Sequence, residues 1–135
     1  MENLVKIAEG VLTSCLAVKP GEEILVITDD SRKEIGEAIY EAAGNLGCEK
    51  ILMVMKEREV SGQEPPKVIA EAMKAADVVI APTAQSLTHT NARIEAAKAG
   101  TRVATMPGIT SEMFSQGAML SLIHISEPTR PISIS

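Results

Sequence analysis

The sequence is poor in aromatic residues and in the residues that usually build reactive centres. Its 135 residues include no Trp, one Tyr, one Phe, two Cys and two His. Aromatic stacking platforms are therefore absent. Cys15 and Cys48 lie far apart, without CxxC spacing or companion histidines, so they predict neither a zinc site nor a disulfide framework. We expect both to be buried free thiols in a reducing cytoplasm.

Clusters of positive charge and long apolar runs are also missing. The formal charge is −5 and the isoelectric point is near 5.1. This balance argues against nonspecific nucleic-acid binding, which depends on clustered Lys and Arg that neutralise phosphates. The opening MENLVKIAEG carries acids and no long apolar run, which excludes a signal peptide, and no segment approaches membrane-spanning length. We expect a cytoplasmic protein with neither nucleic acid nor membrane as a partner.

What remains is the ordinary composition of one globular domain, with 45% apolar and 23% charged residues. An apolar stripe at helical spacing runs over residues 4–16 and is stopped by Lys19-Pro20-Gly21. Residues 23–28 (EILVIT) have the pattern of a strand covered on both faces. A second helical stripe runs over residues 35–46 and ends at Gly47. The first half of the chain therefore predicts helix, strand and helix.

The same alternation continues through the second half. A strand is expected at 50–55 (KILMVM), followed by a helix that Pro65 and Pro66 open and that carries Val68, Ile69, Ala72 and Met73. A strand at 77–81, a helix at 90–99 and a strand at 102–106 follow. A further helix is expected to start at 109–114, with Thr110 or Ser111 as its cap. Repeated alternation with short loops implies right-handed crossovers. The sequence predicts an α/β fold: a truncated Rossmann-like, doubly wound, mainly parallel sheet with helices on both faces.

The end of the sequence changes character. From Leu120 the chain reads LSLIHISEPTRPISIS, with Ser and Ile interleaved and no continuing helical stripe. The part that ends at Arg130 resembles the in-frame translation of a transposase adaptor used to prepare sequencing libraries. We expect residues 1–119 to form the incomplete domain and residues 120–135 to be a non-native tail. The alternative is a genuine terminal strand, since its alternating residues could pair with a sheet edge.

Ligands of parallel sheets usually meet the carboxyl ends of the strands, so residues that follow strands are candidates for a site. Residues 28–31 (TDDS) follow the first strand without the glycines that dinucleotide binding needs, and two carboxylates there would repel a pyrophosphate. A receiver domain would need an aspartate at the end of the third strand, which instead ends APT at 81–83. We expect Asp29, Asp30 or Ser31 to cap the next helix.

The most polar loop of the chain is residues 82–93 (PTAQSLTHTNAR), at the start of a helix. Free N–H groups at a helix start, together with an arginine, can bind a carboxylate or phosphate. His89, Thr90 and Arg93 are therefore candidates for binding a small anionic ligand. The alternative is structural: Thr88 or Thr90 caps the helix while Arg93 pairs with a nearby acid. After the fourth strand, Gly108 predicts a tight turn.

No catalytic constellation is visible in the sequence. A hydrolytic metal site needs several His and carboxylate side chains that converge. With the tail set aside, His89 is the one native histidine, and the chain has no GxSxG elbow, no P-loop and no Cys with a plausible His partner. We therefore assign neither catalytic residues nor metal ligands to this chain.

Two segments carry a family resemblance. Residues 18–43 (VKPGEEILVITDDSRKEIGEAIYEAA) and 87–110 (LTHTNARIEAAKAGTRVATMPGIT) resemble the amino-terminal domain of the aminopeptidase T family, and the likeness covers about residues 1–119. The resemblance implies a cytoplasmic, homodimeric exopeptidase that removes amino-terminal residues from a peptide substrate. It also implies a divalent metal pair (zinc, cobalt or manganese), whose ligands lie in a later domain that this chain lacks.

Two functions stay open from the sequence. The first is a non-catalytic amino-terminal fragment of such a metallo-aminopeptidase, inactive by itself. The second is a stand-alone Rossmann-like module that binds a small anion near His89 and Arg93.

Overall fold

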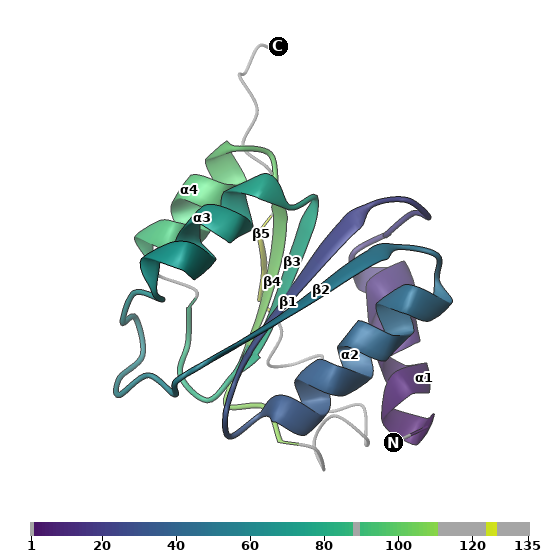
Figure 1. The fold of residues 1–135 in the computed structure, drawn as a ribbon, viewed down its shortest axis with the longest axis horizontal. Coiled ribbons are helices and arrows are strands. Elements are labelled where there is room, and N and C mark those ends of the chain that lie inside the picture. Colours follow the sequence, from purple (N-terminus) through teal and green to yellow (C-terminus); the bar gives the residue numbers. More distant parts are fainter. Residues whose placement is uncertain (1, 88–89, 111–123, 127–135) are drawn as a thin grey trace.

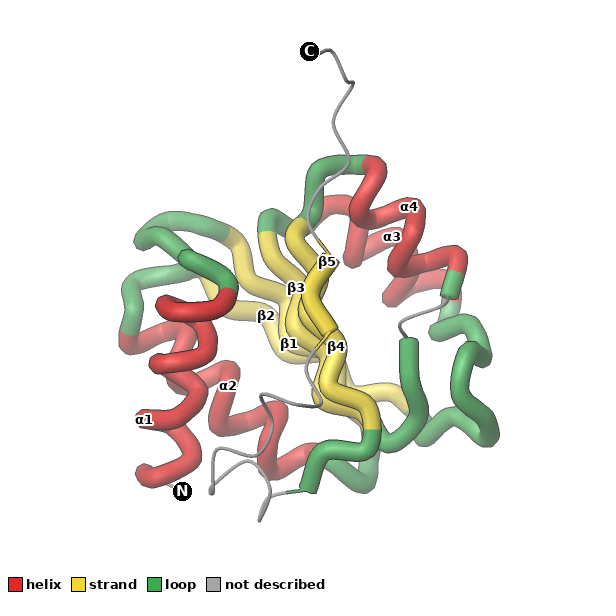
Figure 2. Tube along the Cα trace, turned by 180° about the vertical axis from the view of Figure 1, so that it is seen from behind, coloured by secondary structure: helices red, strands yellow, loops and turns green. Residues whose placement is uncertain are grey.

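The computed structural model describes residues 2–87, 90–110 and 124–126, and these form one sheet with helices on both faces (Figure 1). The elements, in chain order, are α1 (Glu2–Gly10), the π-helical η1 (Val11–Cys15), β1 (Glu23–Asp29), α2 (Lys33–Asn45), β2 (Glu49–Met55), α3 (Lys67–Ala75), β3 (Val78–Thr83), α4 (Asn91–Lys98), β4 (Arg102–Pro107) and β5 (His124–Ser126). Helices α1 and α2 cover one face, and α3 and α4 cover the other (Figure 2).

The strand order is β2-β1-β3-β4-β5, in which the first four strands are parallel and β5 is antiparallel to β4. The chain passes from β1 outward to β2 and then crosses back to β3, so the switch point lies between β1 and β3. The predicted fold class, a doubly wound and mainly parallel α/β sheet, is confirmed.

The core divides into two layers because successive side chains of a strand point to opposite faces. On β1, Ile24 and Val26 pack toward α1 and α2, whereas Leu25 and Ile27 pack toward α3 and α4. Every residue of β3 is buried, and so is all of β1 after Glu23. The expectation that the first strand is covered on both faces is therefore confirmed.

Three local expectations need correction. Helix α2 begins at Lys33 after Arg32, and no side chain caps it, so the predicted cap by Asp29, Asp30 or Ser31 is wrong. Val68, which was expected in the apolar stripe of α3, is 71% exposed, and the buried residues of this helix are Ile69 and Met73. Both cysteines are free thiols, but only Cys48 is buried.

The predicted tail contributes one short strand. Residues 124–126 pair antiparallel with Val103, Ala104 and Thr105 of β4. This pairing with a sheet edge agrees with the alternative of a terminal strand, whereas the adaptor origin of the segment stays a prediction. The helix start expected at residues 109–114, with Ser111 as one cap, falls largely outside the described residues.

Within the described ranges, no helix is both long and apolar enough to cross a membrane.

Gly36 allows α2 to lie close against β1. A Cβ built on Gly36 would stand 2.7 Å from Cγ2 and 2.8 Å from Cβ of Thr28, so any side chain there would push the helix off the strand. Gly44, on the same helix, differs: its Cβ would meet only the far end of Lys50, with the Nζ atom at 2.9 Å. A lysine tip can move at little cost, whereas a buried threonine held between two elements cannot.

We expect Gly36→Ala to lower the free energy of unfolding by about 1–3 kcal/mol, the usual range for overpacking. Gly44→Ala should leave it unchanged or raise it by up to about 1 kcal/mol, because alanine favours the helix. Urea denaturation of both variants measures the difference. Equal destabilisation by the two substitutions would contradict the close packing of α2 on β1.

Candidate functional site

The switch point is closed by a buried carboxylate, that of Asp29 at the end of β1. Its side chain has no exposed surface. Oδ1 accepts hydrogen bonds from the backbone N–H of Ser31 at 3.0 Å and of Arg32 at 3.1 Å, and from the Ser31 hydroxyl at 2.7 Å. Oδ2 accepts from the N–H of Ala84, directly after β3, at 2.8 Å. One carboxylate therefore joins the turns that follow the two central strands.

Thr28, directly before Asp29, adds further contacts between the end of β1, strand β3 and the start of α2. The hydroxyl of Thr28 lies 2.9 Å from the carbonyl of Pro82 on β3 and 2.8 Å from the carbonyl of Arg32 at the start of α2. On the far side of β3, the carbonyl of Thr83 accepts from the N–H of Gly108 at 2.8 Å. Gly108 has φ +69°, which confirms the predicted tight turn after β4. The turns after β1, β3 and β4 are thus linked at the carboxyl edge of the sheet.

The amino terminus of α4, predicted to bind an anion, already holds a carboxylate of the chain itself. Glu64 accepts from the N–H of Asn91 at 2.6 Å and of Ala92 at 3.1 Å. The Thr90 hydroxyl accepts from the N–H of Arg93 at 3.2 Å and donates to the carbonyl of Leu87 at 2.8 Å. Thr90 is therefore the helix cap, as the structural alternative predicted, and the first three N–H groups of α4 have partners.

Glu64 belongs to a loop, residues 56–66, that is attached to the polar loop at three further points. The N–H of Gly62 donates to the carbonyl of Ser86 at 2.9 Å. The Ser61 hydroxyl lies 3.0 Å from Oε1 of Gln85 and accepts from the N–H of Ser86 at 3.3 Å. The two loops therefore form one hydrogen-bonded unit over the carboxyl edge on the α3 and α4 side.

The three residues predicted to bind a ligand differ in their position and burial. Thr90 is fully buried beneath the helix start. Arg93 is partly exposed in the first turn of α4. His89 lies outside the described residues. Binding of an external ligand by these residues stays a prediction, and such a ligand would have to displace the carboxylate of Glu64.

Sequence reasoning did not identify Glu64. It stands in a charged loop, beside prolines that were assigned only to the start of α3. Its partners are 27 and 28 residues further along the chain. No local pattern marks a cap that reaches across two loops.

Metal ligands and reactive nucleophiles do not gather in the described part of the chain. No three His, Cys, Asp or Glu residues within them come together in a way that could hold a metal ion. Burial raises the pKa of the Cys48 thiol, and the charge of Glu22 raises it further. The thiol is therefore less ionised, and less nucleophilic, than an ordinary cysteine at neutral pH. This donor set does not fit a metal centre or a cysteine nucleophile.

Comparison with known proteins gives one family and two informative structures. The profile of the family NicX, 2,5-dihydroxypyridine 5,6-dioxygenase, matches residues 3–116. The chain is similar to the solved structure of 2,5-dihydroxypyridine dioxygenase from Pseudomonas putida KT2440, with a TM-score of 0.55 and 20% identity over 74% of this chain and 32% of that one. It is also similar to wild-type AmpT from Thermus thermophilus, with a TM-score of 0.53 and 15% identity over 90% of this chain and 41% of that one.

These likenesses support the fold that the two proteins share, and this chain spans less than half the length of either. The predicted likeness to aminopeptidase T is thus confirmed at the level of the fold only. The profile match stops at residue 116, before the segment that begins at Leu120. No curated protein sequence matches the chain significantly.

Replacing Asp29 tests the closed switch point. Asp29→Asn keeps one side-chain oxygen and replaces the other by an amide N–H₂ group. This group then faces either the N–H of Ala84 or the N–H groups of the Ser31 turn, and those buried donors lose their acceptor. We expect a loss of about 1–3 kcal/mol in the free energy of unfolding, the range for unsatisfied buried polar groups. The exposed neighbour is the control, and Asp30→Asn should change stability by less than about 0.5 kcal/mol. Urea denaturation distinguishes the two; similar curves would refute the role given to Asp29.

Replacing Glu64 tests the cap of α4. Glu64→Ala should lower the free energy of unfolding by about 1 kcal/mol, as loss of a helix cap does. It should also speed hydrogen exchange at the amides of Asn91 and Ala92, whose acceptor is gone. Glu57→Ala, in the same exposed loop, is the matched control and should change neither quantity. Unaltered exchange at both amides in Glu64→Ala would show that another group caps the helix.

Proposed function

The chain belongs to the family of 2,5-dihydroxypyridine 5,6-dioxygenase, and from this membership we propose that it is the non-catalytic amino-terminal scaffold of a metal-dependent enzyme. The observation that carries the proposal is the carboxyl edge of the sheet. At the position where open α/β sheets bind ligands, Asp29 and Glu64 fill the hydrogen-bonding positions with the chain's own carboxylates. Among the described residues, no group of three His, Cys, Asp or Glu residues could hold a metal ion.

The scaffold role consists in presenting a rigid wall. The turns after β1, β3 and β4 are linked to one another, and the loop of Glu64 is linked to the polar loop before α4. We propose that this edge lines the active-site cavity of the complete enzyme, whose metal ligands are contributed by residues outside this chain. A metal held there would activate water or dioxygen, and the residues described here would limit the space around it.

Two chemistries are compatible with this scaffold. The family match, over residues 3–116, favours a ring-opening dioxygenase that acts on a dihydroxylated pyridine. The resemblance of residues 18–43 and 87–110 to aminopeptidase T, and the fold shared with AmpT, favour a dimeric metallo-aminopeptidase as the second candidate. We rank the dioxygenase first because the profile match concerns sequence as well as fold. A stand-alone anion-binding module ranks third, since Glu64 already holds the amino terminus of α4.

The proposal predicts that the purified 135-residue chain is inactive by itself. With 2,5-dihydroxypyridine and iron(II), the metal of facial-triad oxygenases, it should consume no oxygen above the buffer rate. With zinc or cobalt it should release no amine from an aminoacyl anilide. Turnover by the chain that a chelator abolishes would refute the scaffold role.

Genomic DNA read beyond codon 119 separates the candidates. Continuation into a region rich in His, Asp and Glu supports the scaffold role, and the extended protein then tests the chemistry. Oxygen uptake with the dihydroxypyridine supports the dioxygenase, and cleavage of the anilide supports the aminopeptidase. A native stop codon supports the anion-binding module instead.

A further inference from the structure

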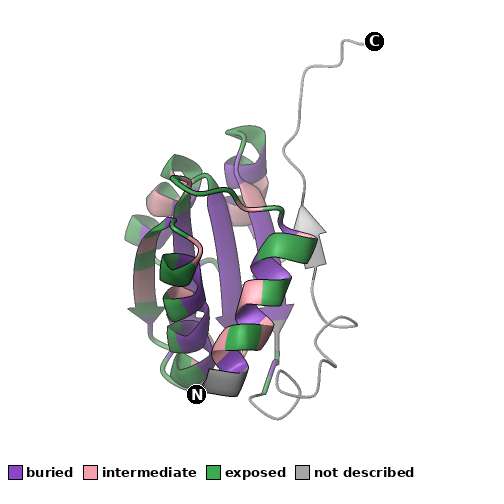
Figure 3. Ribbon diagram, turned by 90° about the vertical axis from the view of Figure 1, so that its right-hand side faces the viewer, coloured by how far each residue is buried: buried purple, intermediate pink, exposed green. Residues whose placement is uncertain are grey.

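Strand β2 forms one edge of the sheet, and its outer side has no strand beside it among the described residues. It pairs with β1 residue for residue from Glu23–Glu49 to Asp29–Met55. Its side chains are exposed or half-buried except for Met55, which is buried, whereas the central strands are buried almost throughout. Figure 3 shows this contrast between the outermost strand and the purple strands beside it. Because the backbone groups of successive residues point to opposite sides of a strand, alternate residues of β2 bond to β1 and the others direct their N–H and C=O groups to this outer edge.

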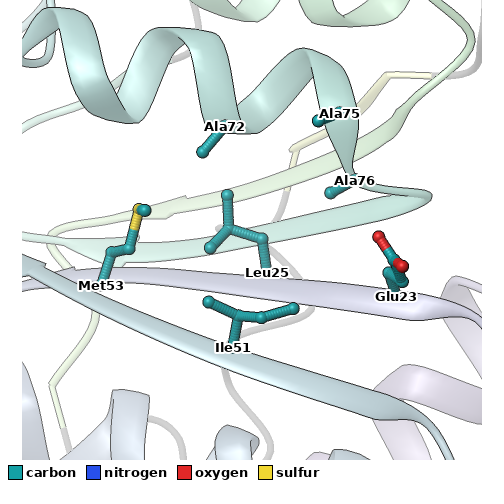
Figure 4. A pocket seen from close by; sticks show the side chains of 7 residues that line it. All are labelled: Glu23, Leu25, Ile51, Met53, Ala72, Ala75 and Ala76. Carbon is teal, nitrogen blue, oxygen red and sulfur yellow. The ribbon is translucent and has the colours of Figure 1, made fainter.

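Both faces of this edge carry exposed apolar side chains. Ile51 on one face is 39% exposed, and Val54 on the other is 41% exposed. Beside Ile51 lies an open apolar groove of about 170 Å³ between β2 and α3. In Figure 4 the side chains of Ile51 and Met53 rise from the sheet toward Ala72 of α3, and Glu23 stands at one end of the groove.

The usual protections of an edge strand are missing from β2. Proteins protect edges with proline, with bulges or with inward-pointing charges. The strand EKILMVM contains no Pro or Gly, and its continuous register with β1 excludes a bulge. Its one lysine is engaged with helix α2: Lys50 Nζ lies 3.6 Å from the carboxylate of Glu41 and 4.3 Å from the ring centre of Tyr40. An edge of this kind is suited to pairing with another strand.

We propose that β2 pairs with β2 of a second copy of this chain, antiparallel about a two-fold axis at Leu52. A closed symmetric dimer requires that the same strand meets itself, and antiparallel pairing provides this. When the axis lies at Leu52, each of the seven residues of β2 lies opposite a residue of β2 in the other copy. Ile51 then lies opposite Met53 of the other copy, so the two grooves join into one apolar surface that the pair of strands buries.

Charge selects this register over its neighbours. A two-fold axis perpendicular to the sheet passes through a residue pair, so registers differ by two residues in their pairing. An axis at Met53 would set Lys50 opposite Lys56 and Glu49 opposite Glu57, and like charges directly opposite destabilise a sheet. An axis at Ile51 would pair only five residues and would set Glu49 against Met53. The axis at Leu52 sets Lys50 opposite Val54 and opposes no like charges within the strand.

The opposition of Lys50 and Val54 gives a test based on the sign of one charge. Val54→Glu places a carboxylate opposite Lys50 of the other copy, and Val54→Lys places a like charge there; each contact occurs twice in the dimer. Because each contact gains or loses about 0.2–1 kcal/mol, we expect the Lys variant to dimerise at least about fourfold more weakly than the Glu variant. Sedimentation equilibrium of the full chain measures both dissociation constants.

Two controls keep the outcome clear. Val60→Lys changes a residue that is 62% exposed in the loop after β2, outside the strand, and should leave dimerisation as in the unaltered chain. Urea denaturation shows whether the two Val54 variants remain equally folded. A chain that stays monomeric at millimolar concentration overturns the proposal. So does a dimer that the Glu and Lys variants weaken equally, because its interface would then lie elsewhere.

Discussion

The carboxylate of Asp29 is the constraint on which the carboxyl edge of this domain depends. It is buried, and a buried charge is tolerable only when its hydrogen-bonding capacity is filled. Asp29 meets that condition by accepting from its own turn and from Ala84, which follows the other central strand. The positions of the β1 and β3 turns are therefore fixed relative to each other. A doubly wound sheet normally leaves a crevice at this point, and here an intramolecular group occupies it.

The parts of the fold that could be predicted were those encoded by local patterns. The runs at β1 and β3 are apolar because those strands are covered on both faces, and Thr90 precedes its helix in the ordinary position of a cap. The parts that could not be predicted depend on partners far along the chain. Asp29 has the sequence context of a helix cap, yet one of its oxygens finds Ala84, 55 residues away. Glu64 caps a helix that begins 27 residues later.

The two edges of the sheet illustrate a second limit of the sequence pattern. Residues 50–55 of strand β2 read KILMVM, an apolar run like those of the central strands, and yet β2 lies at the edge with Ile51 and Val54 exposed. The composition of a strand reports that it belongs to a sheet, whereas its place in the order depends on the crossover connections. At the opposite side of the sheet, β5 pairs with β4, so the long unpaired edge among the described strands is that of β2.

The comparisons place one fold beside two kinds of enzyme, a dioxygenase and an aminopeptidase. A scaffold shared by such different reactions does not determine either of them, because chemistry depends on the groups placed in a site and not on the fold that holds them. In this domain Asp29 and Glu64, at the carboxyl edge, accept hydrogen bonds from backbone N–H groups of the chain itself. Both carboxylates thereby act as hydrogen-bond acceptors within the domain. These hydrogen bonds are the basis of our proposal that the chemistry depends on residues beyond this domain.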